Sequence, residues 1–174
     1  MNEALARISA AGVEVLTRKT HAMVDAIEPD LAAALDLSMR INDFEMRSLI
    51  QSCADRDIEK LSPVVRERIP RATALTLADY RGDLATRDEI RAAYAELAAD
   101  CDACVTLASA GPAPRGLEST GITLMNVPAS LLGIPALTLP VFSVGELPLG
   151  LQVMGFADRD ADLFGIAAWL RDLL

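Results

Sequence analysis

Two neighbouring hydroxyl residues, Ser119 and Thr120, lie in the stretch GPAPRGLESTG at residues 111–121. A serine between glycines can mark a nucleophile on a sharp turn after a strand. The spacing here is G-x-x-S-x-G, one residue longer than the nucleophile elbow G-x-S-x-G, so the pattern does not predict a nucleophile. The prolines and glycines instead predict a loop between two apolar segments. Loops that an apolar scaffold holds in place often carry function, so this loop is the first candidate for a site.

Cys101 and Cys104 form a C-x-x-C pair, CDAC. This spacing occurs in redox-active dithiols and in one half of many zinc sites. A structural zinc ion takes about four ligands, whereas the chain offers one further cysteine, Cys53, and a single histidine, His21. We therefore expect no metal and favour a structural role for the pair, as small apolar residues where a helix gives way to a strand. Half a zinc site and a redox pair are the alternatives.

The bases that hydrolytic chemistry needs are scarce. We interpret His21 as a solvated or helix-capping residue. The two lysines, Lys19 and Lys60, lie in the polar stretches TRKTH and DIEKLS, which are typical of solvated lysines. A lysine that acts as a base needs burial to lower its pKa. The residues alone therefore predict no self-sufficient active site. Because no phosphate-binding loop and no G-x-G-x-x-G motif is present, we also expect no cofactor.

Composition narrows the class of protein. The 174 residues are 52% hydrophobic, enough for a substantial core, and carry a net charge of −9. An acidic chain without a basic patch is unsuited to nucleic acid or to an anionic membrane surface. No apolar run reaches the roughly 18 residues of a membrane-spanning helix, and the first residues do not resemble a signal peptide. We expect a soluble, cytoplasmic protein that binds neither nucleic acid nor membrane.

The elements that would position the loop are predicted to form a single domain over residues 1–174. Residues 1–100 are helix-rich, residues 101–157 are strand-rich, and a terminal helix covers 160–174. Because the strands are continuously apolar, they favour a sheet that is covered on both faces. The predicted fold class is α/β, a mixed sheet covered by helices.

Local signals define several elements more closely. Pro29 is expected to separate a helix at 20–27 from one at 30–52. Ser62 and Thr76 are predicted to cap the next two helices. The predicted strands cover residues 13–16, 103–107, 136–142 and 149–155, and a short helix covers 128–132.

The run from residue 101 onward resembles the C-terminal part of amidase-signature hydrolases. Upstream, the likeness continues more loosely through EALARISAAGVEVL, through INDFE with Glu45, and through ADYRGDLATRDEIRAAY. All 174 residues therefore align with the C-terminal portion of that family. The matching elements, in order, are Asp102-Ala103, Ala113-Pro114, Ser119-Thr120-Gly121, Asn126 with Pro128, Leu132-Gly133, Pro135-Ala136, Leu147 to Gln152, Gly155 and Asp160.

The resemblance implies amide (C–N bond) hydrolysis and the C-terminal part of the amidase-signature fold. The family uses a Ser–cis-Ser–Lys triad, whose lysine and Gly-Gly-Ser-Ser loop precede the part that matches here. Neither motif occurs in this sequence, so no catalytic residue is assigned, and the chain alone is expected to be a truncated, inactive fragment. Three places depart from the family: Cys101 replaces a usual tyrosine, Cys104 replaces an aliphatic residue, and Leu107-Ala108 replaces a usual Thr-Pro at the mouth of the loop.

The resemblance also places the loop near the substrate cleft. It implies that Ser119, Thr120, Gly121 and Asn126 bind a small-molecule amide substrate once the missing half completes the site. The alternative is a surface connection in which the hydroxyls satisfy local backbone groups. A truncated sheet would expose an edge and apolar faces, so we expect a homo-oligomer or a partner chain. The alternative functions are a non-catalytic subunit of a separate catalytic chain and a binding or structural protein.

Overall fold

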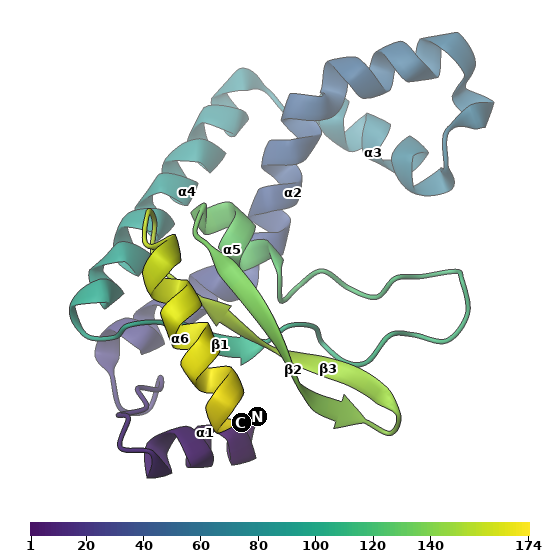
Figure 1. Cartoon of the computed structure of the whole chain (residues 1–174). Coiled ribbons are helices and arrows are strands. Elements are labelled where there is room, and N and C mark those ends of the chain that lie inside the picture. Colours follow the sequence, from purple (N-terminus) through teal and green to yellow (C-terminus); the bar gives the residue numbers. More distant parts are fainter. The chain divides into compact units, whose positions relative to one another are not determined.

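The computed structural model describes all 174 residues, and the chain divides into two compact units (Figure 1). The first comprises Met1–Ala34 and Ile90–Leu174, and the second comprises Leu35–Glu89. Two helices, α2 (Ala22–Asp57) and α4 (Leu77–Glu96), contribute residues to both. The combination of helices and a sheet confirms the predicted α/β fold class. That residues 1–174 fold as a single domain stays a prediction.

The first unit holds a three-stranded antiparallel sheet. Its strands are β1 (Cys104–Leu107), β2 (Ala136–Val144) and β3 (Leu147–Met154), and β3 lies in the middle. All four residues from Leu151 to Met154 are buried, so the second half of the central strand is covered on both faces. The outer strands β1 and β2 each keep one edge without a strand partner. The register of β2 on β3 shifts between Leu139 and Phe142, around Pro140.

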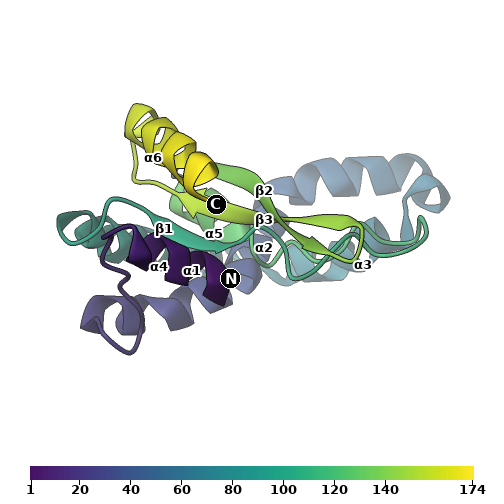
Figure 2. The same cartoon turned by 60° about the horizontal axis from the view of Figure 1, so that its bottom comes forward.

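Two helices close the core of the first unit. Helix α6 (Asp160–Leu173) lies along one face of the sheet (Figure 2), and α1 (Asn2–Ala10) packs against α6. The Arg7 guanidinium donates a hydrogen bond of 2.7 Å to the Leu174 carbonyl oxygen, so the two ends of the chain lie together. One buried cluster of this core comprises Ile8, Leu151, Val153, Leu163 and Leu170.

The second unit is helical throughout. Between α2 and α4 lie the 3₁₀ turn η1 (Ile58–Lys60) and α3 (Pro63–Ala74). Both predicted caps are confirmed. The Ser62 hydroxyl accepts a hydrogen bond from the Val65 amide at 3.4 Å, and the Thr76 hydroxyl accepts one from the Asp79 amide at 3.1 Å.

Two predicted elements are wrong. Helix α2 continues through Pro29, which lies seven residues after its start. The proline removes one backbone hydrogen bond at a cost of about 3 kcal/mol, and burial of Ile27 and Ala34 on either side opposes that cost. Residues 13–16 form no strand, because no neighbouring strand pairs with them; they line a cavity instead. No helix in the structure combines the length and apolar character that crossing a bilayer requires.

Candidate functional site

The candidate loop connects β1 to the short helix α5 (Val127–Leu132) and contains no regular structure up to Thr123. Gly116 and Gly121 adopt φ angles of +90° and +94°, which L side chains rarely take. The Ser119 hydroxyl accepts a hydrogen bond of 3.1 Å from the Gly121 amide. The local turn chemistry that the sequence indicated therefore shapes this part of the loop.

Three of the four predicted substrate residues surround one hollow. Ser119, Thr120 and Gly121 line a space of about 610 Å³, which the loop forms by folding back on its own first residues. Both hydroxyl residues are exposed. The other lining residues are Ser109, Ala110, Gly111, Pro112, Ala113, Pro114 and Ile122. Two hydroxyls at the rim of a hollow walled by prolines and small residues can bind a small polar group without holding it covalently.

The fourth predicted residue, Asn126, lies outside the lining of this hollow. It directly precedes α5, and its exposed side chain makes no capping hydrogen bond. Its carboxamide is therefore open to solvent and does not share the hollow with the hydroxyl pair.

Gln152, the last residue of the Leu147 to Gln152 motif, connects the end of the candidate loop to the sheet. Its side chain is only 3% exposed, and its Nε2 donates a hydrogen bond of 2.9 Å to the Met125 carbonyl oxygen. The link connects the central strand β3 to the residue before Asn126. The sequence signal for this contact is a polar amide in an otherwise apolar strand, because a buried amide needs a hydrogen-bond partner.

A second, larger cavity of about 1390 Å³ lies elsewhere in the first unit. Its walls are mainly apolar and come from α1, residues 13–17, the start of α2, residues 100–106 and α6. Cys101, Cys104 and Tyr94 are among the residues that line it. The predicted position of the two cysteines is confirmed, because Cys101 follows the 3₁₀ turn η2 (Leu97–Ala99) and Cys104 begins β1.

The two thiols differ in acidity. Hydrogen bonds to the Cys104 sulfur from the Cys101 thiol and from the Tyr94 hydroxyl, opposed by burial, lower the pKa of Cys104 to about 7. The Cys104 partner first, and then burial, raise the pKa of Cys101 well above its ordinary value. Burial also raises the pKa of Tyr94. The pair therefore ionises first at Cys104.

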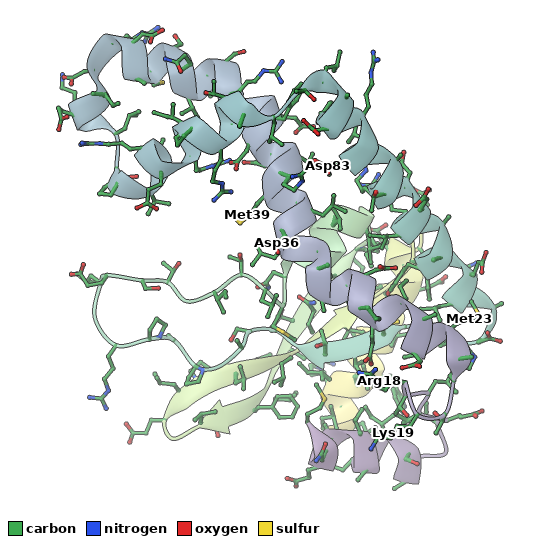
Figure 3. The ribbon with its side chains drawn as sticks, turned by 180° about the vertical axis from the view of Figure 1, so that it is seen from behind. Arg18, Lys19, Met23, Asp36, Met39 and Asp83 are labelled. Atoms are coloured by element: carbon green, nitrogen blue, oxygen red, sulfur yellow. The ribbon has the colours of Figure 1, made fainter.

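Both lysines are exposed, as the sequence indicated, but the interpretation of His21 as a solvated or capping residue is wrong, because its side chain is only 22% exposed and its Nδ1 is buried without a hydrogen-bond partner. Lys60 is exposed and pairs with Asp57 at 3.2 Å. Lys19 is also exposed, in the segment that joins α1 to α2 (Figure 3). His21 stands immediately before α2, and its Nε2 lies 3.3 Å from a carboxylate oxygen of Asp100. Neither lysine is buried, so neither has the position expected of a lysine that acts as a base.

A family model described as Amidase matches residues 1–164. The chain belongs to the amidase family. It is 28% identical over 178 residues to 2-amino-5-chloromuconic acid deaminase from Comamonas testosteroni, an alignment that covers 94% of this chain and 38% of that protein. It is 32% identical over 97 residues to a glutamyl-tRNA(Gln) amidotransferase subunit from Clostridium botulinum, which covers 52% of this chain and 20% of the relative.

A solved amidase structure supports the same assignment. It matches with a TM-score of 0.74 and 29% identity over 83% of this chain and 36% of that one. The resemblance that the motifs indicated is therefore confirmed, and it extends to the first residue. This amidase-family chain spans well under half the length of these relatives.

Proposed function

We propose that these 174 residues form the substrate-facing side of an amidase-signature amide hydrolase whose catalytic serine and lysine are supplied from outside them. The observation that supports this most directly is the hollow lined by Ser119, Thr120 and Gly121 in a chain of the amidase family. The chemistry would be hydrolysis of a carboxamide C–N bond in a small molecule.

The loop has groups suited to an amide. A carboxamide offers one carbonyl acceptor and N–H donors, and a serine or threonine hydroxyl can donate to the first or accept from the second. The side chain of Asn126 can do both through its own amide. In our proposal Ser119 and Thr120 bind the amide group, Gly121 allows close approach of the backbone, and Asn126 contacts the more distant part of the substrate.

The chain alone is proposed to be inactive. Attack by a serine needs a neighbouring base to accept its proton, and both lysines are exposed while His21 faces Asp100. The missing groups would come from a further segment of the same polypeptide or from a second chain.

The test is to join residues 1–174 to the upstream region of an amidase-family protein that carries the Gly-Gly-Ser-Ser loop and the lysine. Ammonia release from a panel of small amides is then measured for the fusion and for the 174 residues alone. We expect hydrolysis by the fusion only. Thr120→Ala in the fusion should raise KM several-fold. Arg115→Ala, in the same loop but outside the lining of the hollow, is the matched control and should leave KM unchanged.

Two results would overturn the proposal. Hydrolysis by the 174 residues alone would mean that the triad lies within them. A correctly folded fusion with full activity and an unchanged KM after Thr120→Ala and Asn126→Ala would remove the loop from the substrate site. Titration of small amides against the backbone amide signals of Thr120 and Asn126 tests binding independently of turnover.

The second candidate function is that of a subunit that pairs with a separate catalytic chain, in the cytoplasm. Two observations favour it: each outer strand of the sheet has an edge without a strand partner, and one relative is an amidotransferase subunit. The native mass of the protein from its own source tests this. A complex with a second, serine-bearing chain supports this second function, copies of this chain alone support a homo-oligomer, and a monomer contradicts both.

A further inference from the structure

Beyond the proposed amidase function, a pair of thiols lies in the wall of the larger cavity. Cys101 and Cys104 both line this space of about 1390 Å³, and no residue from 109 to 122 does so. The thiols therefore lie in a different hollow from Ser119, Thr120 and Gly121, although Leu124 and Met125 of the same loop reach this larger cavity. Both are free thiols, and each is half-buried, so small molecules in the cavity can reach them.

The arrangement of the two sulfurs suits reaction between them. Only two residues separate the cysteines, both line the same cavity, and each side chain shifts the pKa of the other. The Cys101 sulfur also donates a hydrogen bond of 3.3 Å to the Leu97 carbonyl oxygen, which keeps it on the η2 side of the junction. Tyr94 provides a third group, since it lines the same cavity and contributes to the lowered pKa of Cys104.

The hydrogen-bond pattern assigns different roles to the two thiols. A thiolate is the attacking form of cysteine, and neighbouring donors stabilise it. The neighbouring Cys101 and Tyr94 side chains lower the pKa of Cys104, whereas the pKa of Cys101 is raised, so Cys101 retains its proton. Cys104 is therefore the nucleophile, and Cys101 is positioned to react second.

We propose that Cys104 and Cys101 form a redox-active modification site that takes a low-molecular-weight disulfide such as oxidised glutathione. The Cys104 thiolate attacks one sulfur of that disulfide, forms a mixed disulfide and releases one thiolate. Cys101 then transfers its proton to solvent and attacks the Cys104 sulfur, and the second thiol leaves. The Cys101–Cys104 bond forms while the small disulfide is reduced to two thiols, so electrons balance.

The new bond would join the segment that follows η2 to the first residue of β1. One wall of the apolar cavity would then differ between reducing and oxidising conditions.

The experiment uses the full chain with Cys53→Ser, so that only these two thiols remain. The protein is incubated with oxidised glutathione at about pH 7, near the titration of Cys104. Free thiols are then alkylated, and the intact mass is measured. We expect both thiols to become protected, with a mass lower by two hydrogens and no retained glutathione. In the Cys101→Ser variant the reaction should stop at a stable glutathione adduct on Cys104.

Alkylation of the Cys101→Ser variant as a function of pH tests whether a neighbouring hydrogen-bond donor lowers the pKa of Cys104. Its midpoint should lie near 7, because serine keeps a hydrogen-bond donor beside Cys104, and Cys101→Ala should move it upward. A solvated cysteine has a pKa of about 8.5. A Cys104 pKa near 7 therefore means roughly 15-fold more thiolate at pH 7 than a solvated cysteine has.

Either of two results would overturn the proposal. The first is that glutathione adds to Cys104 in the chain with both thiols and is never displaced by Cys101. The second is that both thiols remain alkylatable after incubation while Cys53 of the unmodified chain reacts. Since the Cys53→Ser chain itself carries the test, misfolding of a further variant would not hide the outcome.

Discussion

The hydroxyl of Tyr94 donates a hydrogen bond to the carbonyl oxygen of Gly155, 3.2 Å away, and so connects the last turn of α4 to the residue after β3. The tyrosine is 1% exposed, and its ring lies 5.3 Å from that of Phe156. The hydrogen bond joins two residues that are 61 positions apart in the sequence. The same tyrosine is a neighbour of Cys104 and contributes to its lowered pKa. A phenol has one proton to donate, so the Gly155 carbonyl oxygen and the Cys104 sulfur compete for it.

The Tyr94→Phe change should destabilise the protein. It leaves the buried Gly155 carbonyl oxygen without this donor, and an unsatisfied buried group costs about 1–3 kcal/mol. Tyr80→Phe is the matched control, since Tyr80 donates at 2.8 Å to an exposed carboxylate, Glu45, which water can serve instead. Urea denaturation of both variants measures the difference, and equal losses would contradict the role of Gly155.

Replacing Gln152 with leucine should loosen the candidate loop. The Met125 carbonyl oxygen would lose its 2.9 Å donor, at a cost of about 1–3 kcal/mol. Hydrogen exchange at the Asn126 and Val127 amides, which donate to Thr123, should become faster. Gln51→Leu, which removes an exposed hydrogen bond to Asp55, should leave those amides unchanged; the same effect from both variants would contradict the prediction.

Two glycine-to-alanine changes should act in opposite directions. A Cβ on Gly150 would overlap Thr138 Cγ2 and meet Ala108 Cβ at 3.0 Å, so we expect a loss of about 1–3 kcal/mol from overpacking. A Cβ on Gly82, inside α4, meets nothing within 4 Å, and alanine there should add about 0.5–1 kcal/mol of stability. Thermal unfolding of both variants and of the unchanged protein measures these effects. A Gly150→Ala protein as stable as the unchanged one would contradict the tight packing at β3.

The carboxylate of Asp43 should be essential to the second unit. It is 1% exposed and lies 2.6 Å from both Arg68 and Arg71. Asp43→Asn removes the buried carboxylate that pairs with both arginines. Because the arginine side chains are 24% and 49% exposed and can be solvated, we expect a loss of about 1–3 kcal/mol, below the roughly 3–5 kcal/mol of a fully buried pair.

The control for that variant is Asp172→Asn, because Asp172 forms an exposed pair with Arg171 and exposed pairs contribute about 0–1 kcal/mol. The free energies of unfolding of the two asparagine variants, taken from denaturation curves, should differ by about 1–3 kcal/mol. Similar curves would mean that the Asp43 pairs contribute no more than a surface pair does.

The dithiol should give stability a maximum in pH. Between the lowered pKa of Cys104, about 7, and the ordinary cysteine value of about 8.5, the unfolded chain binds one more proton than the folded chain, so stability rises with pH. Above about 8.5 the unfolded thiols are both ionised while Cys101 keeps its proton, so stability falls. Unfolding free energies of the Cys53→Ser chain, minus those of the same chain with both thiols changed to alanine, should peak near about pH 8.5. A flat difference would contradict the coupling.

Local chemistry made much of the fold predictable. The caps at Ser62 and Thr76 depend on residues within one turn, so the sequence identifies them directly. The predicted helix break at Pro29 is wrong because the energetic cost of the proline is local, whereas the burial that offsets it depends on residues elsewhere in the chain. The strand at 13–16 failed for a similar reason, since strand formation depends on a neighbour that the segment itself does not encode.

The contacts of the candidate site are likewise of two kinds, those within a short segment and those between distant segments. Ser119 and Gly121 approach each other through a turn that the motif encodes. The contacts of Gln152 with Met125 and of Tyr94 with Gly155 join distant segments. Composition and spacing could mark these residues as polar groups in apolar surroundings, but not identify their partners.

The register shift around Pro140 also affects how copies of the chain meet one another. A flat row of unpaired backbone groups is a template on which another chain can add a strand and begin aggregation. Proline has no N–H to offer such a strand, and the irregular pairing between Leu139 and Phe142 interrupts the flat row. The outer side of β2 is therefore a poor nucleus for fibrils, which leaves β1 as the strand where self-association of this kind would begin.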